Sequence, residues 1–510
     1  MSFVHPNIRS NVMSLLQNSN LLILLASVAF GLFAGYTFFL SQGVLGTKLQ
    51  AVVPLVLIAG PAFIVYHQAG WNVDKLLIFF TLIVIPAFLD LDLFYNDSVY
   101  FWVSANGFPI TLTDILFFPL LFKWLLIHNL THPINRPKIH FGQVIGKLLL
   151  LLLAVNVVSA LIAPHPFFSW STIYLQLKCY LFYWFMINVV TDEDHIILVI
   201  RAITIILLSQ SIIALEQNFL GQIFTAERLG LGRDVSVEVT LGDQLLTRVS
   251  GTLGHPNNLA MFINLMLPIL IFSVFSEKNK RWMIVSIITI ALSSMAELWT
   301  ASRGGWLALV IALLLSGAFL AKRRGHNPFI FISIGAIASS LLLIVLFFAS
   351  STINTRLTKD DAGSAEVRYP LMKVARNMIY ENPVLGTGLN NYTASMVKYD
   401  NTYMSVASVY NYPVHNTFLL VGGETGLLGI GTLIALSAML IFMGYKAVFN
   451  LHGVQMHYVL GASAGIITWI IHNQVNLTLI WNDFILWVLV SAIVAGYAKS
   501  RSRENIVQQQ

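Results

Sequence analysis

Four short clusters of polar residues hold the side chains that could do chemistry in this otherwise apolar chain. Arg248 and His255 precede one apolar run, Arg303 joins two others in the sequence Ser-Arg-Gly-Gly, and Arg368 and His415 follow later in the chain. An arginine guanidinium presents a planar fork of donors that suits a phosphate group. A histidine titrates near neutral pH, so it can move a proton. The four clusters together favour a site that binds an anion and transfers a proton.

Each cluster also has a purely structural interpretation. An asparagine after His255 can cap a helix, and Arg303 can extend to a lipid phosphate. Arg368 can belong to a solvated basic face, and His415 can be a satisfied structural group at the end of a span. The residue types alone leave both interpretations open.

The composition fixes the class of protein. The chain has 510 residues, of which 57% are hydrophobic and 10% charged. Soluble domains carry roughly 25% charged residues, so the composition excludes an ordinary cytosolic enzyme, a disordered protein and a nucleic-acid binder. The apolar runs are continuous rather than alternating, which disfavours a β-barrel. We predict an all-α, polytopic integral membrane protein with about 12–14 transmembrane helices and a large external loop containing an amphipathic helix.

The charges between the apolar runs give the orientation. With a cytoplasmic N-terminus, nearly all lysines and arginines of the short loops face the cytoplasm, and the short outer loops hold only Lys48 and Arg303. This asymmetry predicts that both termini are cytoplasmic. The predicted spans are 21–40, 49–66, 76–94, 110–127, 146–163, 170–190, 195–216, 257–276, 281–300, 304–320, 328–349, 416–445, 456–475 and 478–498.

Two long segments then fall on the outer side. Residues 365–380 place apolar side chains at helical spacing, which predicts an amphipathic helix outside the membrane. The turn-forming residues from Asn382 to Gly388 end it. We divide the chain into N-terminal transmembrane helices (1–216), an external loop (217–256), transmembrane helices (257–350), a large external loop with catalytic elements (351–415), C-terminal transmembrane helices (416–498) and a cytoplasmic tail (499–510).

Three further polar features have weaker links to function. Asp90 and Asp92 form an acidic pair that could hold a divalent cation, but such spacing is common by chance. Lys178 falls within a predicted span, where we expect it to pair with a neighbour or to snorkel. No zinc-protease, P-loop, nucleophile-elbow or dinucleotide fingerprint is present. We therefore expect no cofactor.

Taken in order, the four clusters resemble the O-antigen ligase and O-antigen polymerase superfamily. The resemblance covers roughly residues 245–445, and the earlier residues match only as a hydrophobic bundle. The matching pieces are Gly254-His-Pro-Asn257, Ser302-Arg303-Gly304-Gly305, Arg368 with Asn382-Pro383 and Gly386-Thr-Gly388, and His415-Asn416 with Glu424-Thr-Gly426.

The resemblance implies an inverting, metal-independent glycosyltransferase in the bacterial inner membrane, with its active site facing the periplasm. It implies His415 as the catalytic base and Arg303 and Arg368 as contacts to the diphosphate. The further substrate-binding candidates are Arg248, His255, Asn416 and Glu424. The implied partners are an undecaprenyl-diphosphate-linked glycan donor, a lipid A core or glycan acceptor and the lipid bilayer, with no nucleic acid.

The acceptor and the class of protein stay open. A ligase transfers the glycan to a lipid A core or similar acceptor, whereas a polymerase joins lipid-linked repeat units, and both share these motifs. A transporter of a small anion such as bicarbonate is the alternative from another class, with Lys178 and Asn156 lining its path. We see no inverted repeat, which counts against transport. A membrane scaffold for polysaccharide assembly is the third alternative.

Overall fold

The computed structural model describes residues 73–87, 90–96, 99, 101–131, 138–220, 237–241, 244–349, 364–403, 405–478 and 484–509. The predicted spans at 21–40 and 49–66 lie outside these residues. The chain divides into two compact units, of which one comprises residues 1–90, 111–139 and 224–233 and the other holds the remainder. All four polar clusters belong to the second unit.

The first unit contains helices α4 (Val73–Ile83) and α5 (Leu112–Leu130). An ion pair between Asp74 and Lys123 joins them. The predicted span 76–94 is shorter than expected, because α4 ends at Ile83 and the chain turns around Pro86, which has no N–H for a helical bond. The chain then enters strand β1 (Asp90–Leu93), which pairs with β2 (Phe108–Thr111).

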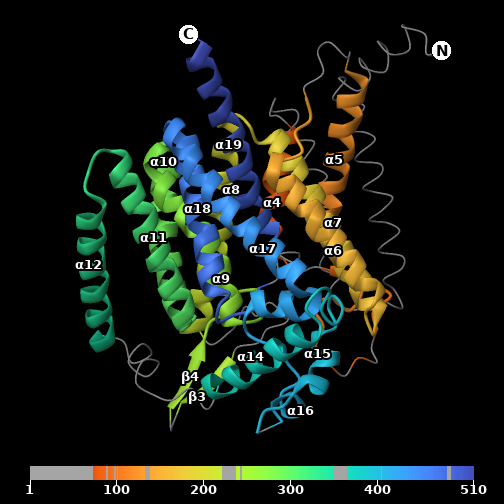
Figure 1. The fold of residues 1–510 in the computed structure, drawn as a ribbon. Coiled ribbons are helices and arrows are strands. Elements are labelled where there is room, and N and C mark those ends of the chain that lie inside the picture. The colour runs from red at the N-terminus through yellow and green to blue at the C-terminus, as the bar shows by residue number, and fades with distance from the viewer. Residues whose placement is uncertain are drawn as a thin grey trace, which may run out of the picture. The chain divides into compact units, whose positions relative to one another are not determined.

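Long apolar helices make up most of the second unit (Figure 1). Across both units, nine of the described helices are long and apolar enough to cross a membrane, which confirms an all-α, multi-pass membrane protein. Helix α7, which carries Gln176 and Lys178, is not among the nine, and neither is α12, of which Pro328–Ile337 counts as a shorter apolar helix. The long helices of this unit are α6 (Gln143–Leu161), α7 (Pro166–Val189), α8 (Glu193–Phe219), α9 (Pro256–Ser273), α10 (Lys280–Trp299), α11 (Arg303–Arg323), α12 (Pro328–Ala349), α17 (Thr417–Asn450), α18 (Gly453–His472) and α19 (Phe484–Gln509).

Helices α9 and α18 form the centre of this unit. Two glycines of α18 let the backbones approach closely: a Cβ on Gly461 would lie 2.4 Å from the Cα of Ile269, and one on Gly465 would lie 2.4 Å from the Leu265 carbonyl oxygen. Thr468 donates to the carbonyl oxygen of Asn264 at 2.9 Å. Small residues at a close helix contact are how membrane helices gain packing energy without a hydrophobic driving force.

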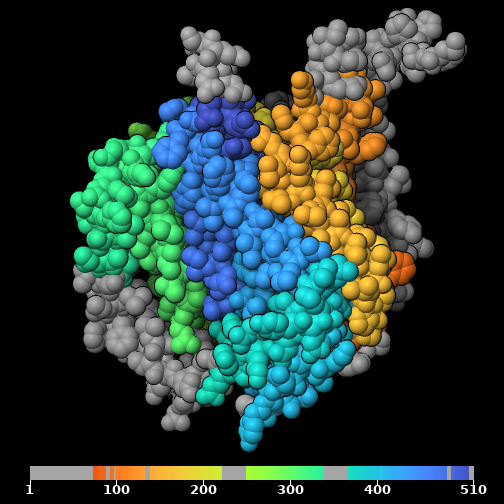
Figure 2. Space-filling view, viewed as in Figure 1, coloured from red at the N-terminus to blue at the C-terminus, as the bar shows by residue number. Residues whose placement is uncertain are grey.

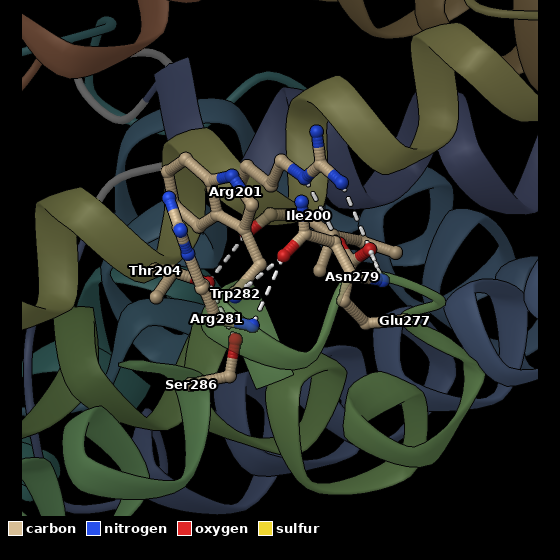
Figure 3. A network of polar contacts seen from close by, with 8 residues as sticks. All are labelled: Ile200, Arg201, Thr204, Glu277, Asn279, Arg281, Trp282 and Ser286. Carbon is tan, nitrogen blue, oxygen red and sulfur yellow. Dashed lines mark hydrogen bonds and ion pairs between the residues drawn. The ribbon is translucent and has the colours of Figure 1, made fainter. Parts of the chain in front are cut away.

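An ion pair fixes the turn between α9 and α10 to α8 (Figure 3). Arg201 of α8 donates from Nε and Nη2 to the two carboxylate oxygens of Glu277, at 2.9 and 2.8 Å, and its guanidinium lies 5.2 Å from the centre of the Trp282 ring. Asn279 caps α10 beside it. Because α9 runs from residue 256 to residue 273, this network lies at the opposite end of α9 from His255.

Two strands and three further helices lie at the His255 end of α9. Strand β3 (Val237–Leu241) pairs antiparallel with β4 (Gln244–Arg248), with Val237 opposite Arg248. Helix α14 (Ser364–Glu381) lies across the ends of the long helices, and the short helices α15 (Tyr392–Ser395) and α16 (Val406–Val409) follow it (Figure 1). The amphipathic helix predicted over 365–380 is therefore present in the structure.

Candidate functional site

Two glutamines of α8 hold the loop that leads from β4 to α9. The side-chain oxygen of Gln217 accepts hydrogen bonds from the amides of Ser250 and Gly251, at 3.0 and 2.9 Å. Gln210 accepts from the amide of Thr252 at 3.0 Å and donates to its hydroxyl at 2.9 Å. Residues seven apart share one face of a helix, so the two amides act on the same loop. Residues 249–253 of the loop are buried.

Arg248 ends strand β4 as a buried side chain with 6% of its surface exposed. Its Nε donates to the carbonyl oxygen of Thr300 at 2.8 Å, and its Nη2 donates to the side-chain oxygen of Asn257 at 2.9 Å. The amide of Val249 also donates to the carbonyl oxygen of Trp299 at 3.3 Å. The first polar cluster is thus attached to the end of α10.

His255 is the N-cap of α9. Its Nδ1 accepts a hydrogen bond from the amide of Asn257 at 3.1 Å, and Pro256 occupies the first helical position. Because Nδ1 accepts, we assign the proton of the neutral ring to Nε2, which is then a donor. Burial, with the nearby charges of Arg248 and then His415, lowers the pKa of His255 to about 4. His255 is therefore neutral at neutral pH and a weak base.

Two glycines follow Arg303 at the start of α11, where there is no room for a side chain. A Cβ on Gly304 would lie 2.7 Å from Cγ2 of Val475 and 3.3 Å from Cδ2 of His472, and one on Gly305 would lie 2.7 Å from Oε1 of Glu297. The start of α11 therefore fits closely between α10 and the end of α18. Arg303 is exposed at the first position of α11.

The second cluster also contacts the end of α18. The hydroxyl of Ser302 lies 3.3 Å from Nε2 of His472, and both side chains are buried. Below this turn, Asn264 donates to the Gly305 carbonyl oxygen at 3.0 Å and to the carboxylate of Glu297 at 3.2 Å. These contacts join α9, α10, α11 and α18 beneath Arg303.

Asn416 caps α17, directly after His415. Its Oδ1 accepts from the amide of Leu419 at 3.0 Å, and its Nδ2 donates to the carbonyl oxygen of Gln474 at 3.1 Å. The amide of Thr417 donates to the carbonyl oxygen of Asn473 at 3.0 Å. The start of α17 is thereby attached to the residues that follow His472.

The ring of His415 is half-buried, and the charge of Arg368, from another polar cluster, acts on it. Burial and then the positive charge of Arg368 lower the pKa of His415, and a hydrogen bond to the Pro413 backbone partly offsets them. The positive charge of Arg368 also acts electrostatically on the ring of His472. His415 in turn acts on His255. Arg248, His255, Arg368 and His415 thus form one electrostatic cluster, which His472 connects to the turn before Arg303.

A loop from Asn382 to Asn391 crosses α17 at a break in that helix. The break is at Gly426, with φ 67° and ψ −163°. The amides of Thr387 and Gly388 donate to the carbonyl oxygens of Gly423 and Glu424, at 2.9 and 3.0 Å. A Cβ on Gly386 would lie 2.3 Å from the carbonyl carbon of Glu424. The glycines of this motif are therefore needed for two backbones to meet.

Glu424 is fully buried at the same crossing. Its carboxylate accepts hydrogen bonds from the backbone amides of Asn390 and Tyr392. Asn391, next in the loop, accepts from the amide of His165 at 2.8 Å, in the turn between α6 and α7. These contacts indicate that Glu424 holds the loop that follows α14. Arg368 lies on α14 itself.

The residues outside this cluster have local partners. Lys178 donates to the carbonyl oxygen of Pro109 at 2.8 Å and lies over the ring of Tyr174, and Asn156 donates to Gln176 at 2.8 Å. Asp92 is exposed, and the side chain of Asp90 is not among those described. Within the described ranges, no group of three or more His, Cys, Asp or Glu side chains is placed to hold a metal ion.

The charged residues of this cluster stand out in the sequence, whereas the polar groups that fix them do not. Gln210 and Gln217 had a signal, because two glutamines seven residues apart in an apolar helix share a face. For His472, the only signal in the sequence was its position near the end of a predicted span.

Comparison with known proteins places a family match on this part of the chain. Residues 288–434 match the family model described as O-antigen ligase. The match contains Arg303, Arg368, His415, Asn416 and Glu424, whereas Arg248 and His255 precede it and His472 follows it. No curated protein matches the chain. The match confirms the resemblance stated from the sequence motifs.

Proposed function

We propose that this membrane protein, whose residues 288–434 match the O-antigen ligase family model, is an inverting, metal-independent glycosyltransferase. It moves a glycan from an undecaprenyl-diphosphate carrier to a lipid A core or similar acceptor. The reaction takes place at the periplasmic face of the bacterial inner membrane, with both termini in the cytoplasm. The observation that carries the proposal is the family match over residues 288–434, because the matched range contains Arg303, Arg368 and His415.

His415 is the general base of this reaction. Because its pKa lies below the ordinary value of about 6.5, the ring is neutral at neutral pH and can take a proton. The acceptor hydroxyl gives its proton to the imidazole, and the acceptor oxygen forms the new bond to the anomeric carbon. A positioned base of this kind contributes roughly 10²–10⁴-fold to the rate.

Arg303 and Arg368 stabilise the leaving group. The bond between the anomeric carbon and the diphosphate oxygen breaks as the new bond forms from the opposite side, and the electron pair leaves with the undecaprenyl diphosphate. Its growing negative charge is stabilised electrostatically by the two guanidinium groups, and no proton transfer is needed. Hydrogen bonds to charged groups contribute about 1.5–3 kcal/mol each.

The other site residues have supporting roles. His255 presents an Nε2 donor beside His415 and binds a substrate hydroxyl or phosphate oxygen. Arg248 contributes positive charge from a fixed, buried position. Asn416 and Glu424 use their polar atoms within the protein, so we assign them to positioning His415 and the loop after α14.

Release of undecaprenyl diphosphate tests the proposal. The protein in lipid nanodiscs is given a short undecaprenyl-diphosphate glycan and candidate acceptors, with and without a metal chelator. We expect acceptor-dependent release that survives chelation and falls by two or more orders of magnitude in His415→Ala. His326→Ala, at an exposed histidine in the turn between α11 and α12, is the matched control and should behave as wild type.

The productive acceptor separates the two members of the superfamily. Transfer to a lipid A core supports the ligase, and transfer to a second lipid-linked repeat unit supports the polymerase. Near-normal transfer by His415→Ala would remove the general base from the proposal. Loss of transfer on chelation would contradict metal independence.

A further inference from the structure

Three exposed tyrosines lie in the segment that leads to His415. We refer to residues 399–412 as the tyrosine segment. Tyr403 is fully exposed, Tyr412 is 59% exposed and Tyr410 is 43% exposed. A group of exposed large side chains in one short segment can mark an interaction site. A tyrosine loses little conformational freedom on binding and offers both a flat ring and a hydroxyl.

The segment that carries these rings is held in a defined shape. The carboxylate of Asp400 accepts from the amide and hydroxyl of Thr402, at 2.8 and 2.5 Å, and from the amide of Ala407 at 2.7 Å. Asn377 of α14 donates to the carbonyl oxygen of Tyr399 at 2.9 Å. The short helix α16, which is part of this segment, packs on α14. The exposed rings are therefore presented by a fixed backbone.

The chemistry of the segment identifies its ligand class. Asp400 is the only charged residue from 399 to 412, and its carboxylate is used by the backbone of the segment. The other polar side chains of the segment are hydroxyls and amides of Ser, Thr, Asn and Tyr. Two cations border this surface: exposed Lys398 directly precedes the segment, and the charge of Lys373 on α14 acts on Asp400. The segment itself offers hydroxyl, amide and aromatic groups. A sugar ring, with apolar C–H faces and hydroxyl groups at its edge, matches it.

The position of the segment connects it to the proposed site. Tyr412 is three residues before His415, so their Cα atoms are within about 11 Å of each other. Helix α16 lies beyond α14 on the side away from the long helices (Figure 1), and the chain near residue 400 protrudes at the lower edge of Figure 2. A glycan whose reacting end is at His415 would extend along this segment, away from the ends of the spans.

We propose that the tyrosine segment is a glycan-binding surface, on which Tyr403 and Tyr412 stack against uncharged sugar rings several units from the reacting end. The inference rests on the proposed glycosyl transfer, because it assigns a second region of contact to the same substrate. It gives the extended part of the glycan a binding region separate from the groups that act on the diphosphate.

Binding to the full-length protein in nanodiscs tests the surface. The probe is the oligosaccharide released by mild acid from the host's own lipid-linked pool, and saturation-transfer NMR reports its contact with the protein. We expect the double variant Tyr403→Ala/Tyr412→Ala to bind at least about tenfold more weakly, and the corresponding Phe variant to bind as wild type. Tyr380→Ala, an exposed tyrosine of α14, is the matched control.

The outcomes separate this inference from the proposed function. His415→Ala should bind the oligosaccharide as wild type does while losing transfer. If the double Ala variant binds and transfers normally, the surface is wrong and the transferase stands. If wild type binds the oligosaccharide through the tyrosines but releases no undecaprenyl diphosphate, the surface stands and the transferase is wrong. Quenching of a Tyr403→Trp variant by brominated lipid would place the segment in the bilayer and overturn the inference.

Discussion

Arg248 donates its Nε proton to the carbonyl oxygen of Thr300 at 2.8 Å, so a guanidinium of the first polar cluster is attached to the backbone three residues before Arg303. The same side chain holds Asn257, in the first turn of α9, at 2.9 Å. Arg248 therefore joins β4, α9 and the turn between α10 and α11. Arg303 differs, because it is exposed at the start of α11. The two arginines should respond differently to removal.

We expect Arg248→Ala to lower stability and Arg303→Ala to lower carrier affinity. Removing the buried guanidinium breaks two charge-assisted hydrogen bonds worth about 1.5–3 kcal/mol each, so Arg248→Ala should unfold at a clearly lower temperature. Arg303→Ala should keep its stability within about 0.5 kcal/mol and bind undecaprenyl diphosphate roughly 10–100-fold more weakly. Thermal unfolding and carrier titration on the same nanodisc samples measure both effects.

Arg376→Ala is the control for loss of an exposed guanidinium, because Arg376 lies on α14 outside the cluster. It should change neither quantity. Unchanged carrier affinity in Arg303→Ala would contradict the carrier-binding role of Arg303. Unchanged stability in Arg248→Ala would contradict the structural role of Arg248.

Arg368 should set the pH at which transfer is lost in acid. Its charge, after burial, lowers the pKa of His415, and transfer needs the neutral ring. Wild type should therefore stay active below pH 6.5 and lose transfer as pH falls through the lowered pKa. Removal of the charge in Arg368→Ala should raise that pKa and move the acid limb of the pH profile towards neutrality.

Arg368→Lys separates the charge from the shape of the guanidinium. It keeps the positive charge, so its acid limb should stay near that of wild type even where carrier affinity falls. The measurement is the pH dependence of kcat/KM for the three proteins, which reports the pKa of His415 in the substrate-free protein. An acid limb at the same pH in all three would mean that Arg368 does not act on His415.

Gly386→Ala should displace the loop that follows α14. Gly386 has a φ of 66°, and a Cβ there would lie 2.3 Å from the carbonyl carbon of Glu424. Backbone atoms cannot move aside as a flexible side chain can, so we expect a loss of about 2 kcal/mol or more and faster proteolysis within residues 382–391. Gly431→Ala, in the same helix as Glu424 and with no atom within 4 Å of its Cβ, should be at least as stable as wild type. Equal behaviour of the two variants would contradict this account of the crossing.

Periodicity and composition predicted most of the fold, because membrane helices satisfy their own backbones and read as long apolar runs. One exception is 76–94, where α4 ends at Ile83, the chain turns around Pro86 and a strand follows. The charged members of the site were also predictable, since Arg303 and His415 are costly in an apolar chain. Glu424 shows the limit: its carboxylate serves two backbone amides of a loop more than thirty residues away along the chain, and such a tertiary contact leaves no local pattern.

His255 should make the protein sensitive to acid. Its pKa is about 4 in the folded protein and about 6.5 in an unfolded chain, so the unfolded state binds the proton more readily. The contribution to stability is complete above pH 6.5 and is lost as pH falls from 6.5 to 4, to a total of about 3 kcal/mol. His255→Asn keeps a side chain that caps helices well and cannot titrate, so its stability should fall less over this range. Denaturant unfolding at pH 7, 5.5 and 4.5 measures the difference, with His326→Asn as the control that should follow wild type. Parallel curves for wild type and His255→Asn would show that protonation of His255 is not opposed in the folded protein.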